Sequence, residues 1–197
     1  MNIRTGKFSR VSNETRIEAE VTLEGSGVSQ IDTGIGFFDH MLELFTMHGG
    51  FDINLSCRGD LEVDGHHTVE DAGIVLGKAF DIALGERRGI ARYGTFFVPM
   101  DESLAMASID IGGRPYLYYQ TPELNEKVGQ FDTQLAEEFF RAFAYSCGIG
   151  LHVRVLYGRN THHMLEAVFK AFGRALKQAA AIVEDTGRIP STKGIMD

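Results

Sequence analysis

The sequence predicts an α+β fold made of two similar halves. Residues 15–23 alternate between apolar and polar side chains, which is the period of a half-buried strand. Residues 66–84 have the length and apolar spacing of a long helix, and residues 161–183 repeat that pattern. Because each long helix begins with a His-His-x-x-Glu motif, we expect two sheets and their helices in layers about a pseudo-twofold axis.

The other elements follow in the same order in both halves. A Gly-Ser-Gly turn follows the first strand, and Gly49 and Gly50 end a short helix. The first half therefore has a ββαβα pattern, with helices at 37–48 and 66–84 and a strand at 51–57 between them. The second half repeats this order, with strands at 96–98, 104–111, 116–119 and 151–157 and helices at 133–147 and 161–183.

Individual residues repeat as well, which indicates an internal duplication. A shift of 98 positions places Asp39-His40-Met41-Leu42 on Glu137-Glu138-Phe139-Phe140. The motif at the start of the long helix repeats at a shift of 96 positions instead of 98. This two-residue difference falls in loops, where length changes are tolerated. We expect the two halves, 1–90 and 91–197, to form one functional domain. A shift of 96 positions places His66, His67, Glu70, Gly77, Lys78 and Ala79 on His162, His163, Glu166, Gly173, Arg174 and Ala175.

Composition narrows the classes of function. The net charge of −8 argues against nucleic acid or an anionic membrane as the main partner, because both require a basic surface. The chain has no signal-like apolar run and nothing near the roughly 18 apolar residues of a membrane span, so we expect a soluble cytoplasmic protein. Cys57 and Cys147 stand far apart and outside any CxxC motif, which predicts reduced core thiols.

The repeated His-His-x-x-Glu motif predicts a metal site. Residues four apart share one face of a helix, so His66 with Glu70, and His162 with Glu166, can each aim at one point. The adjacent histidine is rotated by about a quarter turn, so two helices that meet across the pseudo-twofold axis can use every ring by binding two metals. Imidazoles and carboxylates without a thiolate disfavour structural zinc and favour manganese or iron.

Four stretches resemble the imidazoleglycerol-phosphate dehydratase family: DTGIGFFDHMLELFTMHGGFD from Asp32, DGHHTVEDAG from Asp64, HVRVLYGRNTHHMLEAVFKAFGRALKQA from His152, and IPSTKG near the end. They cover almost the whole chain in the family's order and spacing. The resemblance implies a lyase of histidine biosynthesis that dehydrates imidazoleglycerol phosphate to imidazole acetol phosphate. It also implies a metal-bridged imidazolate at a site that holds two Mn²⁺ ions.

Carried onto this sequence, the resemblance implies two sets of metal ligands. Glu138 departs from the usual pattern, because many members have histidine there. A carboxylate is a good manganese ligand, so we expect altered metal affinity and retained function; the alternative is a solvated glutamate beside Glu137. The alternative for His40 is a helix histidine satisfied by Asp39. The first implied set is His40, His67, His162 and Glu166, and the second is His66, Glu70, His163 and Glu138.

The resemblance also implies residues that bind and convert the substrate. Glu14 lies outside the ligand sets and is the best candidate for general acid and base chemistry, with Glu70 and Glu166 as further catalytic carboxylates. Cationic side chains would hold the phosphate group of the substrate. The implied substrate-binding residues are Glu14, His40, His48, Arg92, Arg114, Lys170, Thr192 and Lys193.

Four polar residues stay open between two roles. Asp101 and Glu102 are either carboxylates that orient the metal ligands or solvated turn residues, and the turn role is favoured. His48, at a helix end, either caps carbonyls or contacts substrate. For His152, which opens a strand, a structural role and a functional role stay equally open.

The resemblance further implies a homo-oligomer, a 24-subunit shell built from trimers with sites between subunits. We expect a monofunctional chain, because 197 residues leave no room for the phosphatase domain that is fused in some relatives. One competing hypothesis is a dinuclear metallohydrolase of phosphate esters. Another is a metal-storage scaffold of ferritin type, which the alternating strands argue against.

Overall fold

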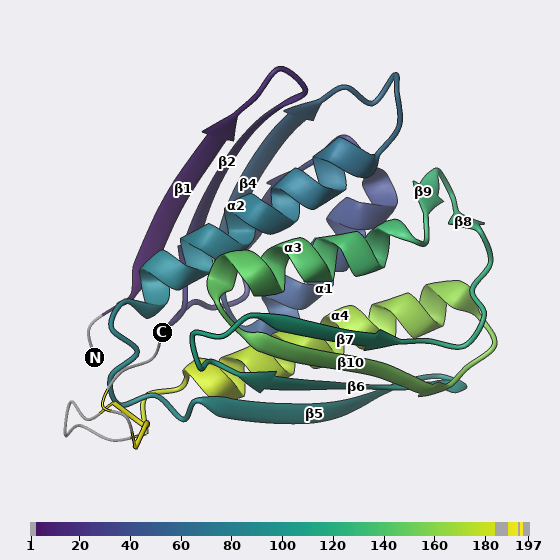
Figure 1. Cartoon of the computed structure of the whole chain (residues 1–197). Coiled ribbons are helices and arrows are strands. Elements are labelled where there is room, and N and C mark those ends of the chain that lie inside the picture. The colour runs from purple at the N-terminus through teal and green to yellow at the C-terminus, as the bar shows by residue number, and fades with distance from the viewer. Residues whose placement is uncertain (1–2, 184–188, 193, 195–197) are drawn as a thin grey trace.

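The computed structural model describes residues 3–183, 189–192 and 194. Its described elements form two four-stranded sheets with four helices between them, as Figure 1 shows, and a two-stranded ribbon. This confirms the predicted α+β class. The elements of the first half are β1 (Thr5–Val11), β2 (Thr15–Thr22), β3 (Ser29–Asp32), α1 (Gly36–Gly49), β4 (Asp52–Gly59) and α2 (His66–Leu84). Those of the second half are β5 (Tyr93–Met100), β6 (Ser103–Asp110), β7 (Tyr116–Gln120), β8 (Lys127–Val128), β9 (Phe131–Asp132), α3 (Leu135–Cys147), β10 (Gly150–Tyr157) and α4 (Thr161–Ala180).

The two sheets have the same topology. Their strand orders are β1-β2-β4-β3 and β5-β6-β10-β7. In each sheet the last strand runs parallel to its neighbour and the other pairs are antiparallel. The alternating residues of β2 and β6 turn one face of each sheet to the core, where apolar side chains are buried.

The helices tie the two halves together. Helix α2 lies on the first sheet and packs against α3, whereas α4 lies on the second sheet and packs against α1. Each helix pair therefore joins one helix from each half. Phe45 and Phe143, which are equivalent at a shift of 98, meet with ring centroids 6.3 Å apart. The buried apolar residues form one continuous core.

Close backbone contacts show how accurately the duplication is preserved. A Cβ atom on Gly6 would lie 2.0 Å from the carbonyl oxygen of Ala79, and one on Gly94 would lie 2.0 Å from that of Ala175. Ala79 and Ala175 are equivalent at the shift of 96 positions. The first strand of each sheet therefore crosses its long helix at the same contact, which requires glycine there.

The structure corrects the predicted number of strands and one predicted boundary. The ββαβα pattern placed two strands before the first helix and gave bounds for only one of them, whereas β1, β2 and β3 all precede α1. Strand β3 is only four residues long and mostly polar, so its sequence has no clear period. Helix α4 ends at Ala180, whereas the sequence pattern predicted a helix to 183. Its end is set by Ile182, which forms an isolated β-bridge with Ile90. No helix in the described part of the chain is long and apolar enough to cross a membrane.

Both cysteines are buried free thiols, as predicted. Burial raises the pKa of the Cys57 thiol to about 11 and that of Cys147 to about 12, so both stay protonated near neutral pH.

Candidate metal centre and active site

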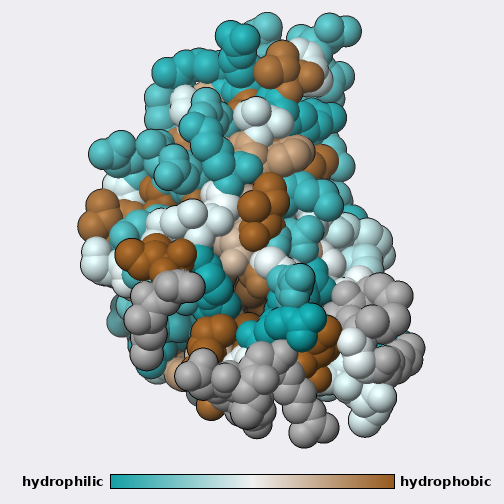
Figure 2. All heavy atoms as spheres, turned by 90° about the vertical axis from the view of Figure 1, so that its left-hand side faces the viewer, coloured by the Kyte–Doolittle hydropathy of each residue, from teal (hydrophilic) through white to brown (hydrophobic). Residues whose placement is uncertain are grey.

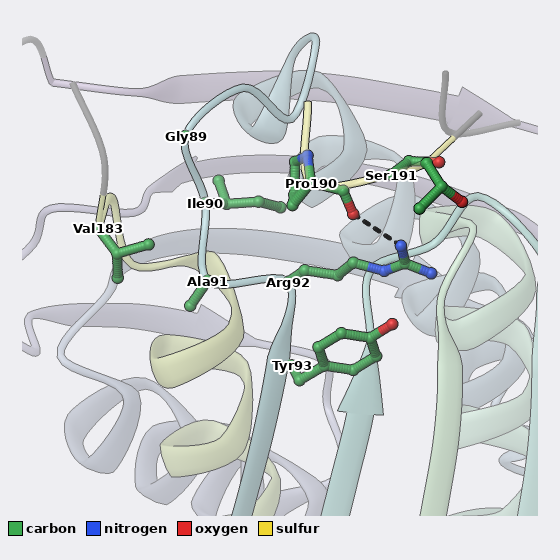
Figure 3. A pocket seen from close by; sticks show the side chains of 9 residues that line it. Gly89, Ile90, Ala91, Arg92, Tyr93, Val183, Pro190 and Ser191 are labelled. Carbon is green, nitrogen blue, oxygen red and sulfur yellow. Dashed lines mark hydrogen bonds between the residues drawn. The ribbon is translucent and has the colours of Figure 1, made fainter. Parts of the chain in front are cut away.

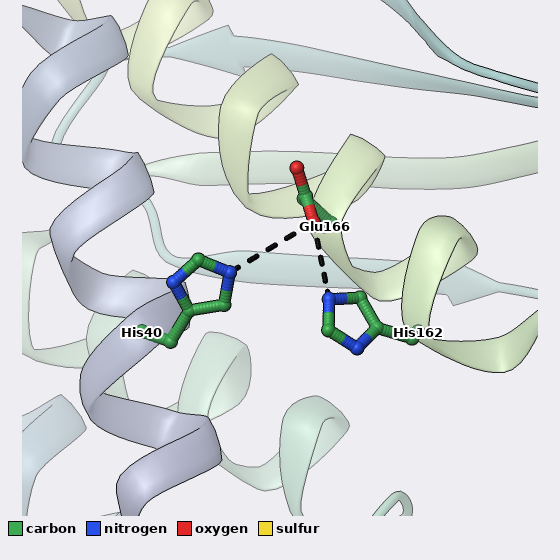
Figure 4. Close-up of side chains that lie close together, drawn as sticks. All are labelled: His40, His162 and Glu166. Carbon is green, nitrogen blue, oxygen red and sulfur yellow. Dashed lines mark hydrogen bonds and ion pairs between the residues drawn. The ribbon is translucent and has the colours of Figure 1, made fainter.

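Two histidines and a glutamate from opposite halves meet between α1 and α4. The Nε2 atom of His162 lies 3.2 Å from Oε2 of Glu166, and Nε2 of His40 lies 3.9 Å from the same oxygen (Figure 4). One ligand atom from each residue falls within 4.8 Å of the others, which makes them a possible metal-binding group. Among the described residues, no other three His, Cys, Asp or Glu side chains meet this closely.

Local structure fixes each member of this group, which we call the α1–α4 cluster. The side chain of Asn160 caps α4 and accepts a hydrogen bond from the backbone nitrogen of His162 at 2.9 Å. Phe37 contacts the His162 ring edge-on, with centroids 5.2 Å apart. The described ion pair of His40 is with Glu166 and not with Asp39, the alternative partner. Oδ1 of Asp39 accepts hydrogen bonds from the backbone nitrogen and hydroxyl of Thr33.

Glu166 is the buried acid of the cluster. Its side chain is 10% exposed, and Lys170 donates to its Oε1 atom at 2.5 Å. Burial alone would raise the pKa of this carboxyl, but the Lys170 hydrogen bond and the His162 ring outweigh burial and lower it. The carboxylate is therefore held in its charged form, with one oxygen facing the two imidazoles.

The equivalent residues of the first half lie further apart. Nε2 of His66 is 3.8 Å from Oε2 of Glu70, which is 45% exposed. Glu138 lies on α3 and its Oε2 atom is 3.6 Å from Nε of Arg141. These three residues occupy the positions of His162, Glu166 and His40 under the internal repeat. They do not form a compact group within one chain.

His67 and His163 point to carboxylates at the loop ends of the two sheets. Nδ1 of His67 lies 3.0 Å from Asp60, and Nδ1 of His163 lies 2.8 Å from Glu102. These hydrogen bonds, which the carboxylates of Asp60 and Glu102 accept, raise the pKa of the His67 and His163 imidazoles. In each residue Nδ1 is occupied, so Nε2 is the atom left to bind a metal.

The prediction that Glu102 is a solvated turn residue is wrong, because its carboxylate accepts hydrogen bonds from other parts of the chain. Besides the His163 ring, it accepts hydrogen bonds from the backbone nitrogens of Asn160 and Arg159 at 2.8 and 3.1 Å. The bond with His163 and these backbone donors hold the pKa of its carboxyl well below the usual range. The Glu102–His163 contact spans 61 residues of sequence, so no local pattern indicated it.

Two further acids approach the outer nitrogens of the same rings. Oε1 of Glu14 lies 3.7 Å from Nε2 of His67, and Oδ2 of Asp101 lies 3.8 Å from Nε2 of His163. Glu14 stands in the turn between β1 and β2, and Asp101 in the turn between β5 and β6. Sequence reasoning missed Asp60, which lies seven residues before its partner.

Arg92 lines a pocket of about 550 Å³ together with Ser191 and Thr192 (Figure 3). Its Nε atom donates to Asp110 at 2.7 Å, and its Nη1 atom donates to the carbonyl oxygen of Pro190 at 2.7 Å. The arginine therefore joins the start of β5 to the segment 189–192. Lys193, the other implied residue here, lies outside the described residues.

The remaining implied residues are spread over the surface. Arg114 is exposed in the loop that follows β6. His48 lies in the last turn of α1, where burial and the charges of Lys170 and Arg174 lower the pKa of its imidazole. His152 lies on β10 with its ring 5.7 Å from that of Tyr118, on the outer face of the second sheet. The structure thus places His48 near Lys170 and His152 away from the α1–α4 cluster.

Comparison with known proteins identifies the family. The sequence model of imidazoleglycerol-phosphate dehydratase matches residues 33–176. The enzyme of this name from Caldanaerobacter subterraneus subsp. tengcongensis is 56% identical over 98% of this chain and 100% of its own length. The one from Clostridium botulinum is 57% identical over 96% of this chain and 97% of its own length.

Solved structures of the same family share the fold. The imidazoleglycerol-phosphate dehydratase of Staphylococcus aureus superposes with a TM-score of 0.81 at 41% identity, over 91% of this chain and 99% of that one. The Pyrococcus furiosus structure superposes with a TM-score of 0.82 at 33% identity, over 95% of this chain and 99% of that one. The chain therefore belongs to the imidazoleglycerol-phosphate dehydratase family, the hydro-lyases that dehydrate imidazoleglycerol phosphate in histidine biosynthesis.

Proposed function

We propose that this chain dehydrates imidazoleglycerol phosphate to imidazole acetol phosphate at a site that holds two Mn²⁺ ions. The observation that carries the proposal is the α1–α4 cluster, in which His40, His162 and Glu166 converge. This group and His67 would hold one ion. The first-half residues His66, Glu70 and Glu138, with His163, would hold the other.

The donor set fits a divalent ion that accepts nitrogen and oxygen ligands. All eight residues offer imidazole or carboxylate atoms, and both thiols lie buried in the core. Octahedral nitrogen and oxygen coordination is typical of manganese and of non-haem iron. The carboxylates of Asp60 and Glu102 fix the tautomer of their histidines, as second carboxylates commonly do for metal-binding imidazoles.

The reaction removes a hydroxyl group from one carbon and a proton from the next, and the resulting enol becomes a ketone. The proton is hard to remove because its carbon has no neighbouring carbonyl group, so the activation must come from the imidazole ring of the substrate. When bound, the metal pair would supply Lewis acidity that stabilises the ring after it loses its N–H proton.

Acidic side chains of the chain would move the protons. Glu14 is exposed, lies 3.7 Å from Nε2 of His67 and is the candidate to take the proton from carbon. Glu70 and Glu166 would act as further acids or bases beside the metals. Lys170 holds one oxygen of Glu166, so the second oxygen remains for the metal or for a proton.

Cationic groups would bind the phosphate of the substrate. Arg92 is held by Asp110, and its contact with Pro190 places Ser191 and Thr192 in the same pocket. Arginine suits this role because its fixed donors match the oxygens of phosphate. Arg114, Lys170 and Lys193 would add to the charge, and His48 would contact the substrate beside Lys170.

The incomplete ligand sets favour a homo-oligomer, for which we propose the 24-subunit shell built from trimers. Within one chain neither His67 nor His163 joins a compact group, so a neighbouring copy would have to bring them to the metals. The outer face of the second sheet carries exposed aromatic side chains, among them Tyr93, Phe97 and Tyr118, which suit burial against another copy. We propose a cytoplasmic location for the assembly.

Turnover of imidazoleglycerol phosphate by chelator-stripped protein tests the function. We expect addition of Mn²⁺ to restore the ketone product without release of inorganic phosphate. His162→Asn should abolish turnover, whereas His152→Asn, which removes a histidine outside the ligand sets, should retain it. Release of phosphate would indicate a metallohydrolase, and no turnover with any divalent ion would refute the dehydratase assignment.

A further inference from the structure

We propose a second binding site, specific for a phosphate group, in the pocket between Arg4 of the first half and Lys177 of α4. This pocket measures about 660 Å³, which is within the usual range of small-molecule sites. Its polar lining includes Glu24, and its apolar wall includes Leu23, Phe51 and Ile182.

Arg4 is the internal counterpart of Arg92. Each arginine stands two residues before the glycine that crosses a long helix, Gly6 in one half and Gly94 in the other. Each is also held by an acid: Arg4 Nε donates to Glu24 at 2.8 Å, just as Arg92 donates to its aspartate. The fold therefore presents the same pre-oriented guanidinium at both places. This comparison rests on the proposed phosphate role of Arg92.

The Arg4 guanidinium has one nitrogen donor without an acceptor among the described residues. Its Nη2 atom donates to the carbonyl oxygen of Ala180 at 2.8 Å, and Glu24 accepts from both Nε and Nη2. Its Nη1 atom is buried and has no hydrogen-bond partner among the described residues. A buried donor without an acceptor is costly, and an anion that enters the pocket would supply one.

Lys177 adds a second positive charge. It makes no hydrogen bond or ion pair to any described residue, and its Nζ atom lies 2.5 Å from the place where a Cβ on Gly50 would stand. Its counterpart in the other half is Asp81, which is paired with Arg87. The two halves therefore differ at this position: the first has a paired acid, and the second has a base without a partner among the described residues.

The charges favour phosphate over a carboxylate ligand. Among the described residues that line the pocket, two cations face one carboxylate, so the lining carries a net positive charge that suits the dianion of a phosphomonoester. The apolar wall would accommodate the short carbon chain of a phosphomonoester. Figure 2 faces the end of the molecule where β1 and β5 begin, and its described surface mixes hydrophilic and hydrophobic residues.

Equilibrium dialysis of the intact assembly with inorganic phosphate and with glycerol phosphate tests the site. We expect two classes of bound phosphate per chain. Lys177→Gln should weaken one class about tenfold, the effect expected from loss of a charged hydrogen bond, and leave dehydratase turnover unchanged. Arg92→Gln should weaken the other class and reduce turnover. Lys78→Gln, which removes a lysine charge from the surface of α2, is the matched control.

Two outcomes would overturn the site. One is that Lys177→Gln binds phosphate as Lys78→Gln does, whatever its melting temperature, and the other is that all phosphate binding disappears in Arg92→Gln. Arg4→Gln loses its ion pair with Glu24, which can prevent folding, so Lys177→Glu serves as the second variant. It should abolish the class of bound phosphate that Lys177→Gln weakens. A Lys177-dependent class in a chain that shows no dehydration would refute the proposed function and retain this site.

Discussion

The Nδ1 atom of His163 lies 2.8 Å from Oε2 of Glu102, on the hairpin between β5 and β6. The hairpin of the second sheet thereby fixes the ring of a histidine on α4. Because Nδ1 is bound, Nε2 is the ring atom left for the proposed metal.

Replacement of Glu102 tests this orientation. Glu102→Gln keeps an oxygen for the backbone nitrogens of Arg159 and Asn160 but removes the charge beside His163. We expect metal affinity to fall by about 10- to 100-fold, the usual effect of losing such a partner. Isothermal titration with Mn²⁺ measures it. Asp101→Asn, at a residue that is 70% exposed, is the control, and equal losses in both variants would contradict the role of Glu102.

Glu138 is a proposed metal ligand for which a solvated helix glutamate was the alternative, and three variants test it as a ligand. Glu138→Gln removes a charged ligand atom, so its Mn²⁺ affinity should fall at least about tenfold. Glu138→His supplies a nitrogen ligand and should retain turnover. Glu137→Gln removes the neighbouring charge, which is paired with Arg141, and should bind Mn²⁺ as the wild type does. Unchanged affinity in Glu138→Gln would make Glu138 a solvated helix residue.

The close contacts of Gly6 and Gly94 predict severe destabilisation on substitution. An added methyl group would lie 2.0 Å from a helix carbonyl oxygen at either position, so strand and helix would have to separate. We expect Gly6→Ala and Gly94→Ala each to cost about 3 kcal/mol or more in the free energy of unfolding. Gly36→Ala, which meets nothing within 4 Å, should change it by less than about 0.5 kcal/mol in chemical denaturation. Similar stability of all three variants would contradict the packing.

Lys170 should stabilise the metal-free protein through Glu166. Lys170→Met leaves a carboxylate that is 10% exposed without its closest cation, which should cost about 2 kcal/mol. Added Mn²⁺ supplies a replacement charge, so it should raise the melting temperature more in this variant than in the wild type. Lys78→Met serves as the surface control. A Lys170→Met protein as stable as that control without metal would show that the pair contributes nothing.

Elements with a strong period were predictable from the sequence. The alternation in β2 and the apolar spacing of α2 identified both elements, and the shift of 96 positions identified the duplication. Elements that depend on distant partners were not predictable. Strand β3 exists because β4 offers it a parallel edge, and α4 stops because Ile182 pairs with Ile90.

The candidate site shows the same division. The i to i+4 spacing of His162 and Glu166 is local, so the sequence predicted that they share one face. His40 and Glu166 are brought together by packing of α1 on α4, which the repeat suggested but did not locate. Asp60 lies in the loop between β4 and α2, and Glu102 lies on the hairpin between β5 and β6. Their contacts with His67 and His163 follow from how these loops fold and not from residue type.

Subunit complementation tests the central claim that neighbouring copies complete the metal site. His67→Asn and His162→Asn should each be inactive when assembled alone. When the two variants are co-expressed in one assembly, about a quarter of the sites should draw their intact parts from different chains, so about a quarter of the wild-type turnover should return. No recovery in confirmed mixed assemblies would show that each chain binds its metals by itself, which would contradict the account.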